Sequence, residues 1–210
     1  LARDRGLPTV MGGVHASVVP EEALKHVDMV VQGEGEQALA RIIDEGLTEG
    51  IVTAPYIRDL DAIPSPARHL MQMEYYGRTT ERNPRSYLHF VPAGARVAAM
   101  LTSRGCPFRC TFCHNVWRGM PFRFNSAERV VEELAQVTTD YRLNHIFFIE
   151  DNFFASKKRL RAVCDMLIGR GADVVWGCNA RVSDVDAELL ALVKAAGCAQ
   201  ITFGFESGSQ

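Results

Sequence analysis

The sequence predicts an α/β fold with parallel sheets, and three observations favour this class. Short apolar segments alternate with amphipathic ones along most of the chain, which is typical of βα units. Hydrophobic residues make up 47% of the sequence, a share sufficient for a buried core. Polar residues directly follow the apolar segments, as they do where parallel strands end at a functional site.

Residues 1–50 contain two predicted βα units. A short strand in residues 7–13 ends in two glycines, and a helix in residues 20–27 opens with proline and two glutamates, which suits the amino end of a helix. A second strand is predicted in residues 28–33, and the helix in residues 34–46 ends at a glycine.

Residues 51–95 have a different character. They hold most of the prolines and show little periodicity, so we expect a linker. The chain begins with Leu1, in a segment that reads as the end of a helix, and it stops just after a predicted strand. We therefore expect both ends to be internal to a longer protein.

Residues 96–210 return to alternating strands and helices. This order predicts half of a parallel α/β barrel or half of a doubly wound sheet. Ser126 is the expected N-cap of the first helix. The predicted strands are 97–103, 145–150, 172–181 and 199–208, and the predicted helices are 126–143, 156–171 and 183–197. The apolar faces expected on the first two helices are Val130, Leu134, Val137 and Tyr141, and Leu160, Val163, Leu167 and Ile168.

The composition excludes several classes of partner. The net charge is -2 and the sequence has no basic run, so we expect neither nucleic acid nor an anionic membrane surface as a partner. No apolar stretch approaches the roughly 18 residues of a membrane-spanning helix. Cys164, Cys178 and Cys198 are scattered over predicted elements, and we expect buried apolar side chains. The cysteine pattern is typical of a metal-binding protein of the reducing cytoplasm.

The other three cysteines lie together in the segment TSRGCPFRCTFC, with the spacing C-x3-C-x2-C. A structural zinc site takes four ligands, usually in two separate pairs, and His114 follows Cys113 too directly to bind the same ion easily. A disulfide would leave one thiol over. Iron–sulfur clusters take one thiolate per iron. Three thiolates on a four-iron cluster therefore leave one iron open for a substrate or cosubstrate.

The segment CPFRCTFC resembles the signature of the radical S-adenosylmethionine (radical SAM) enzymes, in which an aromatic residue precedes the third cysteine. The resemblance implies a partial (β/α)6 TIM-like barrel, of which residues 96–210 are the first half. It also implies that Cys106, Cys110 and Cys113 ligate a 4Fe-4S cluster whose open iron binds SAM. Reductive cleavage then yields a 5'-deoxyadenosyl radical that attacks an unactivated carbon. Phe112 is expected near the adenine.

The same resemblance assigns a role to Glu150, Asp151 and Asn152, which follow a predicted strand. Family members place a Gly-Gly-Glu or an equivalent polar group there, against the amino group of SAM. This sequence lacks Gly-Gly-Glu, so which of the three contacts SAM stays open. A helix-capping cluster before Ser156 is the alternative.

Two further strand ends are expected to contact SAM. Arg181 ends the third strand of this region, and it suits the SAM carboxylate, with a surface salt bridge as the alternative. The segment GFESG resembles the GxESG segment of the family. Glu206 and Ser207 are therefore expected to bind the ribose or the amino acid part of SAM.

The segment GEGEQA, residues 33–38, fits a dinucleotide-binding pattern. Glu34 and Glu36 would repel a pyrophosphate, and the ribose-binding acid expected about 20 residues later would fall in the linker. NAD binding is therefore not the favoured interpretation.

The segments GGVHAS, DMVVQGEGE and DLDAIPSPAR, followed by the cysteines, resemble the cobalamin-binding radical SAM group. That group includes methyltransferases and the anaerobic magnesium-protoporphyrin monomethyl ester cyclase. The resemblance implies that residues 1–50 are the C-terminal part of a Rossmann-like cobalamin-binding domain. Gly12 and Gly13 would pack beside the nucleotide tail of the cofactor, whereas His15 is expected to be structural.

These observations predict a radical SAM enzyme that methylates or cyclises a small-molecule substrate at an unactivated carbon, with cobalamin. The resemblance also implies an external electron donor such as flavodoxin or ferredoxin. A non-catalytic zinc or iron–sulfur electron-transfer module is the alternative, and it predicts metal binding without SAM cleavage. The sequence leaves the substrate open.

Overall fold

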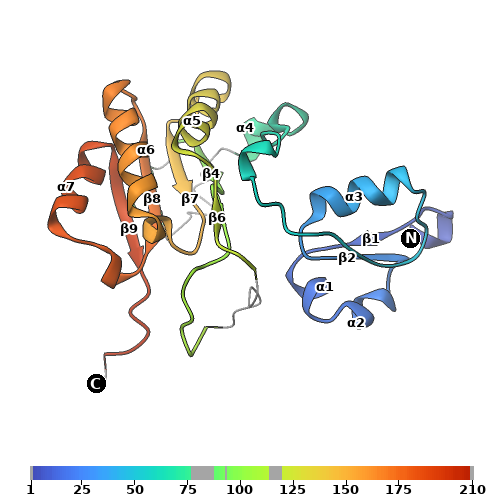
Figure 1. Ribbon diagram of the computed structural model, residues 1–210. Helices are drawn as coiled ribbons and strands as arrows, with labels where there is room; N and C mark the ends of the chain where they lie inside the picture. The colour runs from blue at the N-terminus through green and yellow to red at the C-terminus, as the bar shows by residue number, and fades with distance from the viewer. Residues whose placement is uncertain (1, 77–87, 93, 114–119, 209–210) are drawn as a thin grey trace. The chain divides into compact units, whose positions relative to one another are not determined.

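The computed structural model of the chain describes residues 2–76, 88–92, 94–113 and 120–208 (Figure 1). The chain forms two compact units. The first consists of Leu1–Arg58 with Arg109–Met120, and the second of Asp59–Phe108 with Pro121–Gln210. No helix in the described ranges is long and apolar enough to cross a membrane.

The first unit is a small parallel sheet with helices on both faces. After a 3-10 turn at Arg3–Arg5, its elements are β1 (Val10–Met11), α1 (Val14–Val18), α2 (Pro20–Leu24), β2 (Met29–Gln32), α3 (Gly35–Asp44) and β3 (Gly50–Thr53). The strand order is β1-β2-β3. Successive side chains of β2 point to opposite faces. Helix α3 lies on one face of the sheet and α1 and α2 lie on the other (Figure 1). Met29 and Val31 pack on the α3 face, whereas Val30 packs on the face of α1 and α2.

The sequence does not predict α1 or β3. β3 occupies the start of the segment interpreted as a linker, and it pairs with β2 from Gly50 to Thr53. Val52 is buried in the cluster on the α3 face. A four-residue strand carries little local pattern, and its pairing with β2 is a contact that the sequence does not display.

The second unit contains the predicted alternation of strands and helices. Its parallel strands and their helices are β4 (Val97–Met100), α5 (Ala127–Tyr141), β7 (His145–Phe148), α6 (Lys157–Gly169), β8 (Val175–Ala180), α7 (Ala187–Ala195) and β9 (Cys198–Phe203). Its shorter elements are α4 (Met73–Tyr76), the strands β5 (Ser103–Arg104) and β6 (Arg123–Phe124), and the 3-10 helices η2 (Leu60–Ala62), η3 (Arg68–Leu70), η4 (Phe153–Ala155) and η5 (Val182–Asp184).

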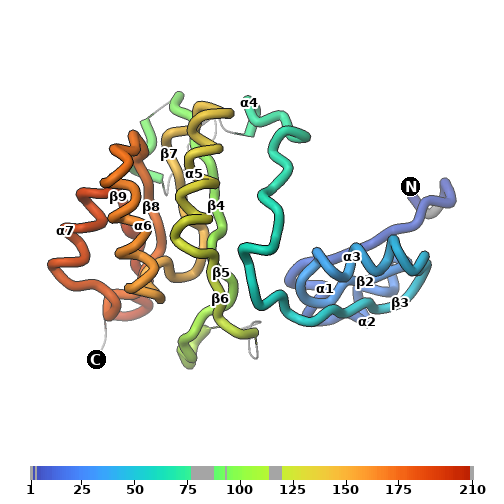
Figure 2. Tube along the Cα trace, turned by 45° about the horizontal axis from the view of Figure 1, so that its top comes forward, coloured from blue at the N-terminus to red at the C-terminus, as the bar shows by residue number. Residues whose placement is uncertain are grey.

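The topology of this unit distinguishes between the two predicted architectures. The strand order β4-β7-β8-β9 follows the chain, and every pair is parallel. Helices α5, α6 and α7 lie side by side on one face of the sheet (Figures 1 and 2). The other face is covered by residues 88–91 around Val97 and Phe147. A doubly wound sheet carries helices on both faces, so the unit is the first half of a barrel.

The main core lies between this sheet and its helices. The Phe148 ring stacks on Phe153 with 4.3 Å between centroids, and Trp176 meets both rings at 5.6 Å. The predicted N-cap is confirmed, since the Ser126 hydroxyl accepts a hydrogen bond from the backbone N–H of Arg129. Two predictions of burial differ from the structure. Ile168 is 45% exposed, because it lies beyond the buried stripe of α6, and Cys198 is half-buried whereas Cys164 and Cys178 are buried as expected.

Candidate active site

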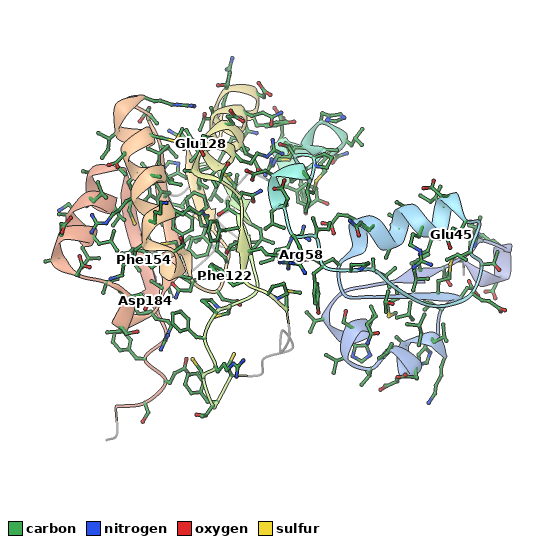
Figure 3. All side chains as sticks on the ribbon, viewed as in Figure 1. Glu45, Arg58, Phe122, Glu128, Phe154 and Asp184 are labelled. Atoms are coloured by element: carbon green, nitrogen blue, oxygen red, sulfur yellow. The ribbon has the colours of Figure 1, made fainter. Side chains whose placement is uncertain are left out.

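The four parallel strands of the second unit bring the predicted site residues to one edge. Because the strands are parallel, their carboxyl ends meet there. The cysteine segment follows β4, Glu150–Asn152 follow β7, Arg181 follows β8, and Glu206 and Ser207 follow β9. Phe154 and Asp184, labelled in Figure 3, mark this edge just beyond β7 and β8. The topology thus places the attachment points of all these groups together.

The cysteine loop, residues 105–122, begins at β5 and returns at β6. These two strands pair antiparallel, Ser103 with Phe124 and Arg104 with Arg123. The backbone N–H of Asn125 donates to the carbonyl of Thr102 at 2.9 Å, which extends the pairing by one step. The base of the loop is therefore a two-stranded ribbon at the end of β4.

The three cysteines of the loop are reduced and accessible. Cys106 and Cys110 are half-buried, and Cys113 is exposed. The backbone N–H of Cys113 donates to the carbonyl of Cys110 at 3.2 Å, which closes a turn between them. Among the residues that the structure describes, no three His, Cys, Asp or Glu side chains are gathered closely enough to hold a metal. His114 lies outside those residues. The donor set suits an iron–sulfur cluster. Phe112 is exposed.

The side chain of Glu150 lies in a buried hydrogen-bond network and does not extend into solvent. Its Oε1 accepts from the backbone N–H of Thr102 at 3.1 Å and also from the Thr102 hydroxyl. The Arg159 Nη2 lies 3.7 Å from the same oxygen. Burial raises the pKa of Glu150, and the hydrogen bonds and Arg159 offset this only in part. Its Oε2 is buried and has no hydrogen-bond partner in the described structure.

The two residues after Glu150 differ from each other. Asp151 is exposed. Asn152 is buried, its side-chain oxygen accepts from the backbone N–H of Phe154, and its Nδ2 donates to Asp184 at 2.6 Å. Asn152 therefore caps η4 and joins the ends of β7 and β8, which is the role that the capping alternative describes.

Arg181 contacts the cysteine loop directly. Its guanidinium carbon lies 3.8 Å from the centroid of the Phe108 ring, a cation–π contact. Phe108 lies between the first two cysteines of the loop. Arg181 thus connects the end of β8 to the segment that follows β4.

Glu206 and Ser207 are exposed beyond β9. Glu206 has φ 55, in the left-handed region, and its carboxylate lies 2.8 Å from the point where a Cβ on Gly204 would sit. A side chain at position 204 would therefore require only this exposed, flexible carboxylate to move.

The sequence does not identify Thr102, Phe108, Arg159 or Asn179, although all four contact the predicted groups. Asn179 donates from Nδ2 to the carbonyl of Glu150 at 3.1 Å. One signal is visible in the sequence. Arg159 lies in the first turn of a helix, where a positive charge opposes the helix dipole, so its position needs another explanation.

The first unit has a cavity of about 330 Å³ at its own strand ends, lined in part by Ser17, Gln32, Thr53 and Tyr56. The Ser17 hydroxyl donates to the carbonyl of Gly13 at 2.8 Å and accepts from the backbone N–H of Gly33 at 3.0 Å. This hydroxyl therefore joins the loops after β1 and β2 beside the cavity.

Gly12, Gly13 and Glu34 lie in the loops that follow β1 and β2 of the first unit. Gly13 has φ 94 and precedes α1, and a Cβ added at Gly12 would lie 3.8 Å from Val31. Glu34 is buried, and its Oε2 accepts from the backbone N–H of Ile57 at 2.9 Å. Glu34 thus holds the chain after β3, a structural role for part of the GEGEQA segment.

Comparisons with known proteins agree with this geometry. The family model of the radical SAM superfamily matches residues 100–210. An uncharacterized methyltransferase of Pyrococcus horikoshii is 30% identical over 95% of this chain and 45% of its own length. The anaerobic magnesium-protoporphyrin IX monomethyl ester cyclase of Rubrivivax gelatinosus is 29% identical over 96% of this chain and 39% of its own length. The chain thus spans less than half the length of these relatives.

Two solved structures share the fold at 20% sequence identity. The radical SAM methyltransferase TsrM of Kitasatospora setae, which was solved with cobalamin and a 4Fe-4S cluster bound, has a TM-score of 0.64 over 95% of this chain and 43% of its own. The cobalamin-dependent radical SAM enzyme OxsB has a TM-score of 0.68 over the whole chain and 33% of its own. These folds confirm a Rossmann-like unit followed by half of a barrel. The chain belongs to the radical SAM superfamily.

Proposed function

We propose that this chain is the cofactor-binding part of a cobalamin-dependent radical SAM enzyme that methylates or cyclises a small molecule at an unactivated carbon. One observation carries the proposal. A loop with three reduced cysteines follows the first strand of a half-barrel, within the residues matched by the superfamily. The relatives include both methyltransferases and a cyclase, so both reactions are retained.

Cys106, Cys110 and Cys113 would hold a 4Fe-4S cluster. When bound and reduced, the cluster supplies the electron that splits SAM and so starts radical chemistry. Three ligands suit this role, because they leave one iron open to SAM. Phe112, exposed beside Cys113, is free to contact the adenine. The electron would come from a donor such as flavodoxin or ferredoxin in the cytoplasm.

The strand ends would bind the rest of SAM. Asp151 is the exposed member of the three polar residues after β7, so we assign it to the SAM amino group ahead of Glu150 and Asn152, whose side chains are engaged within the protein. Glu206 and Ser207 would contact the ribose or the amino acid part. Arg181 would serve the SAM carboxylate by leaving its stacked position on Phe108.

The first unit would contribute to the cobalamin site. Its cavity lies at the ends of β1, β2 and β3, where open α/β sheets bind nucleotide-like ligands. The loop that begins with Gly12 and Gly13 flanks this cavity and would lie beside the nucleotide tail. In this proposal the cobalamin domain extends beyond residue 50 to include β3 and Tyr56, the residues from there to 95 form the linker, and 96–210 form the radical SAM core.

The test uses the full-length protein, purified without oxygen and reconstituted with iron and sulfide. After reduction with dithionite and addition of SAM, 5'-deoxyadenosine is measured. Cys110→Ala is the test variant, and Cys198→Ala, a half-buried cysteine outside the loop, is the matched control. We expect product from the wild type and the control and none from Cys110→Ala. A stable cluster that never cleaves SAM would support the electron-transfer alternative, and zinc in place of iron would refute the proposal.

A further inference from the structure

We propose that Arg159 is a positioning residue that fixes the base of the cysteine loop. The inference rests on the proposed function, because it concerns how the loop presents its thiols to a cluster. The base is the ribbon of β5 and β6, and its geometry sets where residues 105–122 begin and end. The family resemblance assigns no role to Arg159.

Arg159 contacts the residue just before β5 and the last residue of β6. Its Nη2 donates to the hydroxyl of Thr102, the residue before β5. Its guanidinium carbon lies 5.4 Å from the ring centroid of Phe124, the last residue of β6. A single side chain from α6 therefore contacts the chain where it enters the loop and where it leaves.

Two further residues, Phe153 and Glu150, contact the guanidinium of Arg159. The Phe153 ring lies 5.3 Å away, and Glu150 Oε1 lies 3.7 Å from Nη2. Glu150 also accepts from the backbone N–H of Thr102. Thr102 is thus fixed by Arg159 and Glu150 together. The three polar residues come from the end of β4, the end of β7 and the first turn of α6.

Stability alone is a poor explanation for this arrangement. Arg159 is 7% exposed and Glu150 is 3% exposed, and burying such a pair often stabilises a protein no better than apolar residues of similar size. Arg159 also lies at the helix end that disfavours positive charge. A planar guanidinium does supply a fixed hydrogen-bond direction and a flat face that stacks on a ring, and a lysine ammonium supplies neither. Both properties are used here, the hydrogen bond on Thr102 before β5 and the flat face on Phe124 of β6.

Three variants of the full-length protein separate positioning from plain stability. Arg159→Met removes the hydrogen bond and the charge, and Arg159→Lys keeps only the charge. The double variant Glu150→Gln with Arg159→Met removes both charges, so that no unpaired charge stays buried. Arg161→Met is the control on the same helix, since Arg161 forms an exposed ion pair with Glu188 at 2.8 Å.

The readouts are iron retention against a chelator, the electron paramagnetic resonance spectrum of the reduced cluster with SAM, and thermal unfolding of the metal-free protein. We expect Arg159→Met and Arg159→Lys to lose iron about 10-fold more readily than wild type, the effect typical of residues that orient metal ligands. We also expect a changed resonance spectrum. The double variant should regain thermal stability without regaining iron retention or the wild-type spectrum.

Two results would overturn the inference. In the first, the double variant recovers iron retention together with stability, so that Arg159 acts only on folding. In the second, Arg159→Met retains iron as well as Arg161→Met does. Failure of the wild type itself to bind iron is a different result, because it contradicts the proposed function and the inference with it.

Discussion

The six cysteines of the chain should react very differently with an alkylating reagent, and the structure allows the difference to be estimated. The perturbation is iodoacetamide, added to the metal-free full-length protein at about pH 8. Cys164 has no exposed surface, and burial raises the pKa of its thiol from 9.0 to about 12. The three loop cysteines are half-buried or exposed.

The thiolate is the reactive form of cysteine. At about pH 8, a thiol of pKa 9.0 is roughly one-tenth ionised, whereas one of pKa about 12 is ionised in about one molecule in ten thousand. The reactive thiolate fraction of Cys164 should therefore be roughly 1,000-fold smaller than that of an ordinary thiol, and burial also hinders the reagent. Cys178 is equally buried, and its pKa is also raised, first through its contact with Cys198 and then by burial.

The assay is a time course of alkylation followed by peptide mass spectrometry. We expect label on Cys106, Cys110 and Cys113 long before Cys164 and Cys178, and we expect a reconstituted cluster to protect the loop cysteines alone. Protein unfolded in urea is the control, in which all six should react. Labelling of Cys164 within 10-fold of the loop cysteines in the folded protein would refute the reasoning.

Three other predictions concern stability. Because burial raises the pKa of Glu150, thermal unfolding should show wild type losing stability relative to Glu150→Gln as pH rises above about 4.5. A difference in melting temperature between the wild type and Glu150→Gln that does not vary with pH would contradict this prediction. Gly197→Ala should cost more than about 1–2 kcal/mol in urea unfolding, since φ is 93 and a backbone oxygen lies 2.2 Å from the added Cβ. Gly169→Ala in open space is its control. In a double-mutant cycle of Arg181→Met and Phe108→Leu, the coupling should be about 1 kcal/mol, and zero coupling would exclude the stacked contact.

Local rules predict the helices and most strands of this chain. The caps Ser126 and Asp186 bond to the backbone three residues onward, and such contacts are written in neighbouring positions of the sequence. The apolar stripe of α5 follows from spacing in the same way. The two-residue strands β5 and β6 carry no such pattern. They exist because Ser103 meets Phe124 across the cysteine loop.

For the candidate site too, the sequence predicts what depends on neighbouring residues and misses the contacts between residues distant in the chain. Parallel strands bring their carboxyl ends together, so the sequence places Glu150 and Arg181 at the correct edge. Their partners are distant in the chain. Thr102 lies 48 residues before Glu150, and Phe108 belongs to another strand's loop. No short-range pattern shows that the carboxylate of Glu150 turns toward Thr102 while Asp151 stays exposed. The partners that hold the Glu150 carboxylate, Thr102 and Arg159, come from other elements of the fold.

The ribbon of β5 and β6 makes the arrangement of the barrel strands independent of the length of the cysteine loop. Because the chain is joined again at Arg104 and Arg123, residues can be added or removed between them without shifting the register of β4 against β7. The entropic cost of closing a loop rises only slowly with its length, by about 0.6 kcal/mol for each doubling of the number of residues. Cysteine loops of different length can therefore be accommodated on the same scaffold, provided that the three cysteines and the residues that contact the ribbon are kept.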